Sequence, residues 1–472
     1  MKALASVARL IMTLAVTALV GINAHSAGPK YIFYFIGDGM GVGQVMSAQT
    51  YNRVALGNDD RIVMMQFPVA SMLETYSASS NVTDSAAAGT ALATGHKTNN
   101  GMLGVTPDST AVTSVAKVLH DNGWGVSLVT SVAPDDATPG AFYAHVPSRG
   151  MLYEIGRQAA ESGYEFIAGS SWRAAYDREG KSTGLLEYMQ SLNIDLATNT
   201  SDARSSEARR VFLYSDHPFT DGNAGFTIDS IPGALRLPDM TLTAIEHMKR
   251  VSPDHFFMMV EGGNIDHAAH GNDGSTVAIE VLNFNEALQH AYDFYLEHPD
   301  ETLIVVTADH ETGGMSVGNR RGGYAFNAHS ISYQKMSKDM FSAHVKKLLN
   351  DPEAVTTWEQ YKEIASTYTG LWSHIKVSEG QESRLKQLFD DTFEKRKALS
   401  DERTLYSSYN ALATETYKVA NDNIGFGWTT GGHSGNPVPL YAIGCGAEAF
   451  GSLMDNTEVA PKMMQIAGYK LN

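Results

Sequence analysis

A serine at the start of a helical pattern is a candidate nucleophile. Ser85 follows Asp84 and opens an alanine-rich run over residues 85–94. Backbone N–H groups and the dipole at a helix N-terminus favour an anion, and a nearby metal ion can lower the pKa of a hydroxyl enough to make it a nucleophile. Capping of the helix by Asp84 or Ser85 is the alternative, so this segment alone leaves both interpretations open.

Carboxylates and imidazoles in three further segments are candidate metal ligands. Asp266 and His270 are four residues apart, so a helical turn would direct both at one point. Glu261 precedes them at the end of an apolar run, and His433 lies in a glycine-flanked loop as a possible third ligand. A solvated helix face explains the Asp266 and His270 pair equally well.

Charged residues also follow two other apolar runs. Asp309 and His310 come after residues 303–306, and a charged pair at the end of a buried strand needs neutralisation by a metal ion or a salt bridge. Asp38 follows residues 31–36 between two glycines, which allow a backbone to approach a ligand closely. The alternative for Asp38 is an ordinary turn aspartate.

Together these segments supply aspartates, histidines and a serine without a cysteine thiolate. Mixed His/Asp coordination is typical of catalytic zinc, and two such ions a few Å apart support phosphoryl transfer. Arg149 is a candidate clamp on a phosphate, because its guanidinium matches two oxygens. Read alone, Arg149 is better explained as a surface salt bridge.

The elements that must position these residues follow a βα alternation. Continuous apolar runs at residues 31–36, 256–260 and 303–306 predict strands buried on both faces, and residues 85–94, 113–122 and 277–296 have helical patterns. We therefore predict an α/β fold with a doubly wound, mostly parallel central sheet and helices on both faces. Ligands bind at the carboxyl edge of such sheets. Residues 337–417 predict a mainly helical insertion that serves as a cap or a subunit contact.

The N-terminus and the composition indicate an exported protein. Residues 1–26 read as a signal peptide, with Lys2 and Arg9 before a short apolar run, and residues 27–472 as the catalytic domain; a retained membrane anchor is the alternative. Cys445 is the only cysteine, so no intrachain disulfide can form. The net charge of −17 argues against binding to nucleic acid or to an anionic membrane.

The motifs resemble those of the alkaline phosphatase family, in the family's order through nearly all of residues 27–472. The matching segments are residues 37–41, Asp84-Ser85-Ala86, residues 136–139 with Arg149 thirteen positions later, Glu261 with Asp266 and His270, Asp309 with His310, and His433. The resemblance implies hydrolysis of phosphate monoesters at alkaline pH through a phosphoserine on Ser85, and it implies a homodimer. The signal-peptide pattern predicts that the protein is periplasmic or secreted without a membrane anchor.

The resemblance also implies three metal sites. Asp266, His270 and His433 would hold one zinc ion, and Asp38, Asp309 and His310 would hold a second. Asp38 would bridge to a magnesium ion completed by Thr138 and Glu261, and Arg149 would grip the phosphate.

The chain departs from the best-known members near this third metal. Bacterial relatives often pair the equivalent of Asp136 with lysine where this chain has His267, and animal enzymes tend to carry histidine at both places. Our hypothesis is that His267 contacts the phosphate through water and that Asp136 supports the magnesium shell.

Two alternatives come from different classes of protein. A superfamily relative could act on phosphodiesters or sulfate esters, although a sulfatase needs proline and arginine where this chain has Ala87 and Gly89. A non-catalytic periplasmic binder of zinc or phosphate would bind metal without turnover. Comparing turnover of a phosphate monoester, a phosphodiester and a sulfate ester distinguishes a superfamily relative from a monoesterase. Any turnover excludes a non-catalytic binder.

Overall fold

The computed structural model describes residues 28–216, 225–351, 357–395 and 399–471. The predicted signal peptide, residues 1–26, lies outside these ranges. Within them, no helix combines the length and the apolar character needed to cross a membrane.

A ten-stranded sheet forms the centre of the molecule. From one edge to the other, its strands are β16 (Met454–Asp455), β2 (Val69–Glu74), β15 (Val438–Gly444), β8 (Thr302–Thr307), β1 (Tyr31–Ile36), β7 (Phe256–Glu261), β3 (Gly125–Thr130), β4 (Phe166–Gly169), β6 (Val211–Tyr214) and β5 (Asp195–Ala197). In this sheet β15 runs antiparallel to both of its neighbours, and every other neighbouring pair is parallel. The predicted mostly parallel sheet is confirmed.

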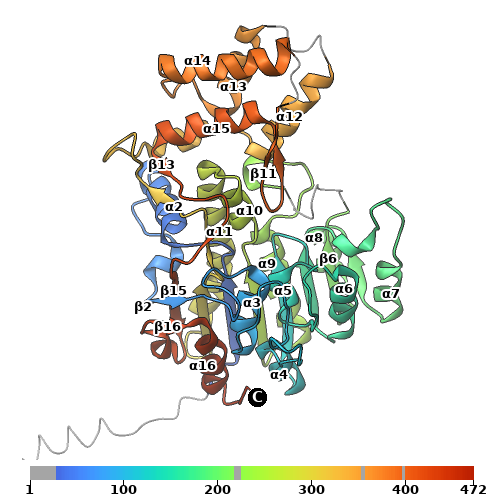
Figure 1. Cartoon of the computed structure of the whole chain (residues 1–472). Coiled ribbons are helices and arrows are strands. Elements are labelled where there is room, and N and C mark those ends of the chain that lie inside the picture. The colour runs from blue at the N-terminus through green and yellow to red at the C-terminus, as the bar shows by residue number, and fades with distance from the viewer. Residues whose placement is uncertain (1–27, 217–224, 352–356, 396–398, 472) are drawn as a thin grey trace, which may run out of the picture.

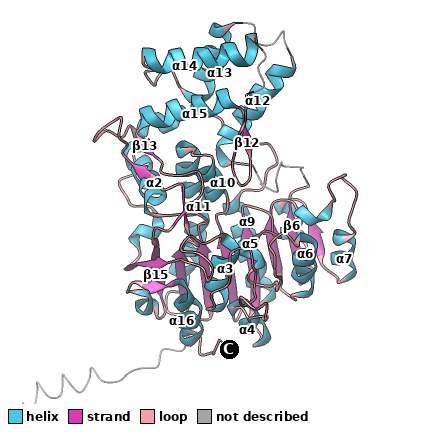
Figure 2. Cartoon of the chain, viewed as in Figure 1, coloured by secondary structure: helices cyan, strands magenta, loops and turns pink. Residues whose placement is uncertain are grey.

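Helices cover both faces of this sheet (Figure 2). One layer contains α2 (Val42–Val54), α8 (Thr200–Ser205), α9 (Leu237–Val251) and α11 (Gly274–Glu297), and α11 contacts both α2 and α9. On the other face, α3 (Ser85–Thr94) contacts α4 (Val115–Asp121), α5 (Ala137–Gly140) and α16 (Val459–Ile466), and α6 (Leu152–Glu161) contacts α7 (Leu185–Ser191). The doubly wound α/β class is thus confirmed, and the three predicted helical patterns overlap α3, α4 and α11.

The central strands end together at one edge. Every residue of β1, β7 and β8 is buried, as their continuous apolar runs predict. Ile36 at the end of β1 lies opposite Glu261 of β7 and Thr307 of β8, and Thr130 of β3 lies opposite Glu261. Asp38, Asp309 and the helix α10 (Asn264–His270) follow these ends directly, so one edge collects the candidate residues.

Three short ladders lie outside the main sheet. They pair β9 (Glu311–Thr312) with β14 (His433–Ser434), β10 (Ser316–Val317) with β13 (Phe426–Gly427), and β11 (Glu402–Arg403) with β12 (Ser408–Tyr409).

A group of helices stands apart from the sheet, beyond the edge where α10 lies (Figure 1). It comprises α12 (Lys338–Asn350), α13 (Trp358–Thr369), α14 (Glu379–Phe389), a π-helical turn (Asp390–Glu394) and α15 (Ala411–Ile424). Phe341, Tyr361, Phe389 and Tyr417 form a buried aromatic core between these helices. The β11–β12 hairpin projects from this group toward the sheet (Figure 1).

Candidate metal and phosphate site

Ser85 is the first residue of α3 and faces the edge of the sheet where the ligands gather. Asp84 is the N-cap, and its Oδ1 accepts a hydrogen bond from the Ala87 backbone N–H at 3.0 Å. Capping by Asp84 leaves the buried Ser85 hydroxyl available, with its Oγ 3.2 Å from Nε2 of His310. The two interpretations of this segment are therefore compatible, because Asp84 does the capping.

Asp266, His270 and His433 converge on one point. Asp266 and His270 lie on α10, as their spacing predicts, with Oδ2 and Nε2 3.4 Å apart. Nε2 of His433 lies 3.1 Å from Nε2 of His270 and 3.7 Å from Oδ1 of Asp266.

Asp38, Asp309 and His310 converge on a second point beside Ser85. Nε2 of His310 lies 3.4 Å from Oδ1 of Asp38 and 3.1 Å from Oδ2 of Asp309. The two groups adjoin, because the His310 and His433 rings stack with their centroids 3.6 Å apart. The structure thus brings together all six residues predicted to bind zinc.

The spacing of these atoms suits zinc ions. Four ligands about 2.0–2.1 Å from a tetrahedral zinc lie roughly 3.3 Å from one another, which is close to the separations within each group. Buried carboxylate oxygens normally accept hydrogen bonds, yet in the described part of the chain no donor reaches Oδ1 of Asp38, Oδ2 of Asp266 or Oδ2 of Asp309. A cation in each group would satisfy these oxygens.

Hydrogen bonds at the other ring nitrogens orient the histidines. Nδ1 of His270 lies 2.7 Å from the Gly431 carbonyl, and Nδ1 of His433 lies 2.8 Å from the Thr83 carbonyl. Since a carbonyl only accepts, each Nδ1 carries a proton, so Nε2 of each ring presents a lone pair when the imidazole is neutral, as metal binding requires. Two bare nitrogens 3.1 Å apart repel unless a cation lies between them.

The buried charges of the two ligand groups shift the pKa values of the three aspartates. Burial, followed by repulsion from Asp309 and Asp266, raises the pKa of Asp38 well above its ordinary value. Burial and repulsion from Asp266 raise the pKa of Asp309 to about 7. Burial opposes ionisation of Asp266 as well, but the imidazoles of His270 and His433 outweigh it and hold the pKa of Asp266 well below its ordinary range. A divalent cation would relieve the crowding of these carboxylates.

Local backbone geometry makes this convergence possible. Gly39 has φ of +70°, and a Cβ there would meet Oγ1 of Thr312 at 2.8 Å and Oδ1 of Asp266 at 2.9 Å. In the β9–β14 ladder His433 lies opposite Thr312, two residues after His310. The predicted loop around His433 therefore contains a short strand whose register sets one histidine beside the other.

A third set of oxygens adjoins the second group. The Thr138 hydroxyl lies 3.4 Å from Oδ2 of Asp38, and Glu261 accepts a hydrogen bond from the Thr130 hydroxyl. Burial raises the pKa of Glu261 to about 8, although hydrogen bonds from Thr130 and Thr138 oppose the shift. An oxygen-only set of this kind is typical of magnesium.

Arg149 lies between two carboxylates at the side of the site. Its Nη1 is 3.3 Å from Oδ2 of Asp84, and its Nη2 is 3.0 Å from Oδ1 of Asp136. Arg173 approaches the other oxygen of Asp136 at 3.5 Å. Burial disfavours the charged form of Asp136, but Arg149 and Arg173 hold its pKa below the ordinary value.

Sequence reasoning missed Thr312, Arg173 and Tyr406. Thr312 donates a short hydrogen bond to Asp266, and its Oγ1 lies 3.2 Å from Nδ1 of His310. Thr312 could have been predicted from the sequence, because it lies only two residues after the candidate ligand His310. No sequence signal pointed to Arg173. Tyr406, whose ring stacks on His267, belongs to the segment that we predicted to be a cap or a subunit contact.

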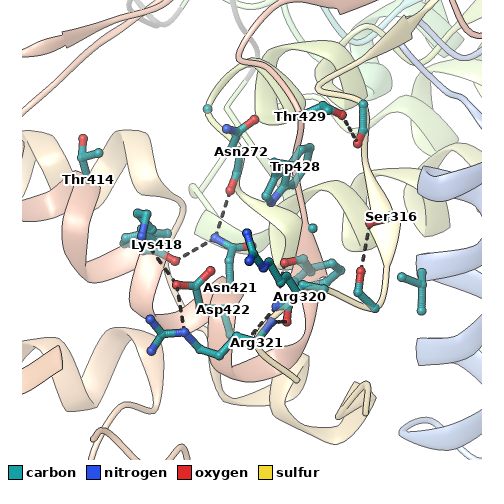
Figure 3. A pocket seen from close by; sticks show the side chains of 18 of the residues that line it. Asn272, Ser316, Arg320, Arg321, Thr414, Lys418, Asn421, Asp422, Trp428 and Thr429 are labelled. Carbon is teal, nitrogen blue, oxygen red and sulfur yellow. Dashed lines mark hydrogen bonds and ion pairs between the residues drawn. The ribbon is translucent and has the colours of Figure 1, made fainter. Parts of the chain in front are cut away.

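A cavity of about 1070 Å³ lies beside this site, between α15 and the β10–β13 ladder (Figure 3). Its wall includes Asn272, two residues after His270, and the cations Arg321 and Lys418, which approach Asp422 at 3.7 and 3.5 Å. Among the described residues that line it there is none of the predicted ligands, so it adjoins the candidate chemistry without containing it.

Comparison with known proteins decides the family. The sequence model described as alkaline phosphatase matches residues 29–174 and 166–469. The chain belongs to the alkaline phosphatase family. It is 29% identical to alkaline phosphatase 3 of Bacillus subtilis (strain 168), over 94% of this chain and 90% of that protein.

Solved alkaline phosphatases share the fold. The cold-active enzyme from a psychrophilic Shewanella species superposes with a TM-score of 0.76 at 25% identity, over 92% of this chain and 99% of that one. The Thermus thermophilus alkaline phosphatase gives 0.76 at 25% identity, over 94% and 92%. The predicted family, fold and enzyme class are therefore confirmed, and the resemblance to alkaline phosphatases extends to the three-dimensional structure.

Proposed function

We propose that this chain hydrolyses phosphate monoesters through a phosphoserine on Ser85, with two zinc ions and one magnesium ion. The observation that carries the proposal is the pair of adjoining ligand groups beside Ser85, whose buried oxygens and bare imidazole nitrogens have the spacing of tetrahedral ligands. Family membership supports the reaction class.

Each protein group has a distinct task in this reaction. Arg149 binds two phosphate oxygens and orients the phosphorus toward Ser85. Oγ of Ser85 forms a bond to phosphorus as the bond to the ester oxygen breaks, and water later hydrolyses the phosphoserine to inorganic phosphate. Bound zinc would lower the pKa of the Ser85 hydroxyl and stabilise charge on the departing oxygen.

The geometry supports the assignment of ligands that the resemblance implies. Asp266, His270 and His433 would hold one zinc ion, and Asp38, Asp309 and His310 the other. The magnesium ion would be held by Thr138, Glu261 and Oδ2 of Asp38, the oxygen beside the Thr138 hydroxyl. We keep the hypothesis that His267 contacts the phosphate through water and that Asp136 supports the magnesium shell. The ion pairs of Asp136 with Arg149 and Arg173 give Asp136 a second role, which is to orient Arg149.

Replacement of the nucleophile tests the proposal directly. We expect Ser85→Ala to lower turnover of p-nitrophenyl phosphate at least about 1000-fold while zinc content stays normal, because none of the six ligands is altered. Ser47→Ala is a matched control, since Ser47 is also a buried helical serine and donates to Gln44 within its own helix. Full activity of Ser85→Ala would remove the serine from the mechanism.

Comparison of ester classes tests the substrate. We expect the wild type to prefer a phosphate monoester to a diester or a sulfate ester, and a preference for the diester would favour a superfamily relative instead. Chelation should abolish turnover, and zinc with magnesium should restore it. Metal binding without any turnover would identify a non-catalytic binder.

We also propose that the chain acts outside the cytoplasm, as a periplasmic or secreted homodimer. The N-terminal pattern of residues 1–26 and the resemblance to alkaline phosphatases support this proposal. Cell fractionation of the full chain and its mass in solution would test the location and the assembly. The boundaries of the helical insertion, predicted at 337–417, likewise stay a prediction.

A further inference from the structure

A hairpin of the helical group brings one tyrosine, Tyr406, onto two histidines of the candidate site. This tyrosine lies on the turn between β11 and β12, the hairpin that projects toward the sheet (Figure 1). The neighbouring Leu405 is exposed on the same turn, whereas Tyr406 is partly buried against the site. The two adjacent side chains thus have different surroundings.

The hairpin is fixed in place by contacts at its base. Ser407 and Tyr409 both donate hydrogen bonds to Asp339 at the start of α12, the second with a length of 3.0 Å. Lys338 lies over the Tyr409 ring, and its Nζ donates to the Gly271 carbonyl at 3.0 Å. Because Gly271 follows the predicted ligand His270, these contacts hold the hairpin at the end of α10.

The Tyr406 ring packs on two histidines of the candidate site. It stacks on His267 with ring centroids 3.8 Å apart and planes inclined by 30°. It meets His270 edge to face, with centroids 5.2 Å apart and planes at 74°. Such ring contacts fix the position of the Tyr406 ring.

The Tyr406 hydroxyl lies within the electrostatic reach of the phosphate pocket. Burial raises the pKa of the Tyr406 phenol well above its ordinary value, and the charges of Asp266, Arg149, Asp136 and Asp38 also act on it. The contacts with His267 and His270 therefore place the phenol beside the candidate phosphate and metal site. A tyrosine hydroxyl is a good hydrogen-bond donor to an anionic oxygen.

We propose that Tyr406 contacts the substrate phosphate, its hydroxyl donating a hydrogen bond beside Arg149 while its ring closes the side of the site next to His267. The inference rests on the proposed function and deepens it, because it gives the helical group a part in substrate binding. The group then acts as a wall of the active site as well as a cap.

Two substitutions of Tyr406 separate the hydroxyl from the ring. We expect Tyr406→Phe, which keeps the stacking on His267, to raise KM for p-nitrophenyl phosphate about 10-fold with kcat within about 3-fold of wild type, as suits one lost hydrogen bond to a charged group. We expect Tyr406→Ala, which also removes the ring, to lower kcat/KM about 30- to 300-fold. Leu405→Ala on the same turn is the matched control and should match the wild type in both constants.

Binding of inorganic phosphate to the metal-loaded protein gives a readout that does not depend on turnover. Isothermal titration should show a Kd about 10-fold weaker in Tyr406→Phe, with zinc content and melting temperature unchanged. An unchanged phosphate Kd in both Tyr406 variants would overturn the proposal, even if KM for the ester rose. If the wild type hydrolysed no monoester, the proposed function would fail, but this titration would still test the contact.

Discussion

Replacement of Arg149 with methionine removes the proposed phosphate clamp while keeping a side chain of similar length. Nη1 and Nη2 of Arg149 each carry two hydrogens and direct one of them at a carboxylate, Asp84 or Asp136. One N–H therefore remains on each terminal nitrogen. Two N–H groups on the terminal nitrogens of a guanidinium can form a parallel fork that matches two oxygens of a phosphate.

The magnitude follows from those two contacts. Each hydrogen bond to a charged group contributes about 1.5–3 kcal/mol, so losing both weakens transition-state binding by roughly 3–6 kcal/mol, or about 150- to 25,000-fold in kcat/KM. Because 23% of the Arg149 side chain is exposed, solvent screens part of the interaction, and we expect a loss of about 100- to 1000-fold. Arg149→Lys retains a charge without the fork, so its loss should be about 10- to 30-fold.

Steady-state kinetics with a phosphate monoester, at saturating zinc and magnesium, measures both variants. Arg53→Met is the matched control, because Arg53 is an exposed arginine in the last turn of α2. A kcat/KM of Arg149→Met within about 10-fold of wild type, with normal metal content, would refute the assignment of Arg149 as the clamp. Equal losses in the lysine and methionine variants would refute the role of the fork.

Two further predictions concern metal affinity and stability. Thr312→Val removes the hydroxyl that contacts Asp266 and His310, so zinc should bind about 10- to 100-fold more weakly in a chelator competition; unchanged affinity would contradict the orienting role. Burial raises the pKa of Glu280 to about 7 from an ordinary 4.5, so the folded state holds this proton more tightly and Glu280 makes the protein less stable as pH rises from about 4.5 to 7. Glu280→Gln stays neutral, so its free energy of unfolding in urea should rise relative to wild type by up to about 3 kcal/mol between pH 5 and pH 8. A difference in unfolding free energy that stays constant over this range would show that Glu280 does not titrate in it.

The fold and most of the candidate site could be predicted because their signals are local. The apolar runs of β1, β7 and β8 are continuous, and strands of that kind are buried on both faces of a parallel sheet. The carboxyl ends of neighbouring parallel strands lie at the same edge of the sheet. Strand prediction alone therefore brings together residues that are far apart in sequence. The spacing of Asp266 and His270 likewise becomes a contact once α10 forms.

The remaining site residues depend on tertiary contacts that no local pattern encodes. Arg173 reaches Asp136 from a segment without a recognisable motif. Tyr406 reaches His267 only because the hairpin base is fixed on α12. The sequence of 337–417 indicated helices correctly, but its amphipathic pattern concerned their packing and gave no information on which turn faces the metal ligands.

The ladder between β9 and β14 has a consequence for the paired cations. His310 directly precedes one strand and His433 begins the other, so the spacing between the two proposed zinc ions is tied to the repeat of a β-ladder. Loss of either ion would loosen a shared backbone element, and we expect demetallation to be cooperative, with few molecules retaining a single zinc. The distance between the two cations would then be preserved as long as the ladder of Glu311 and Thr312 with His433 and Ser434 remains paired.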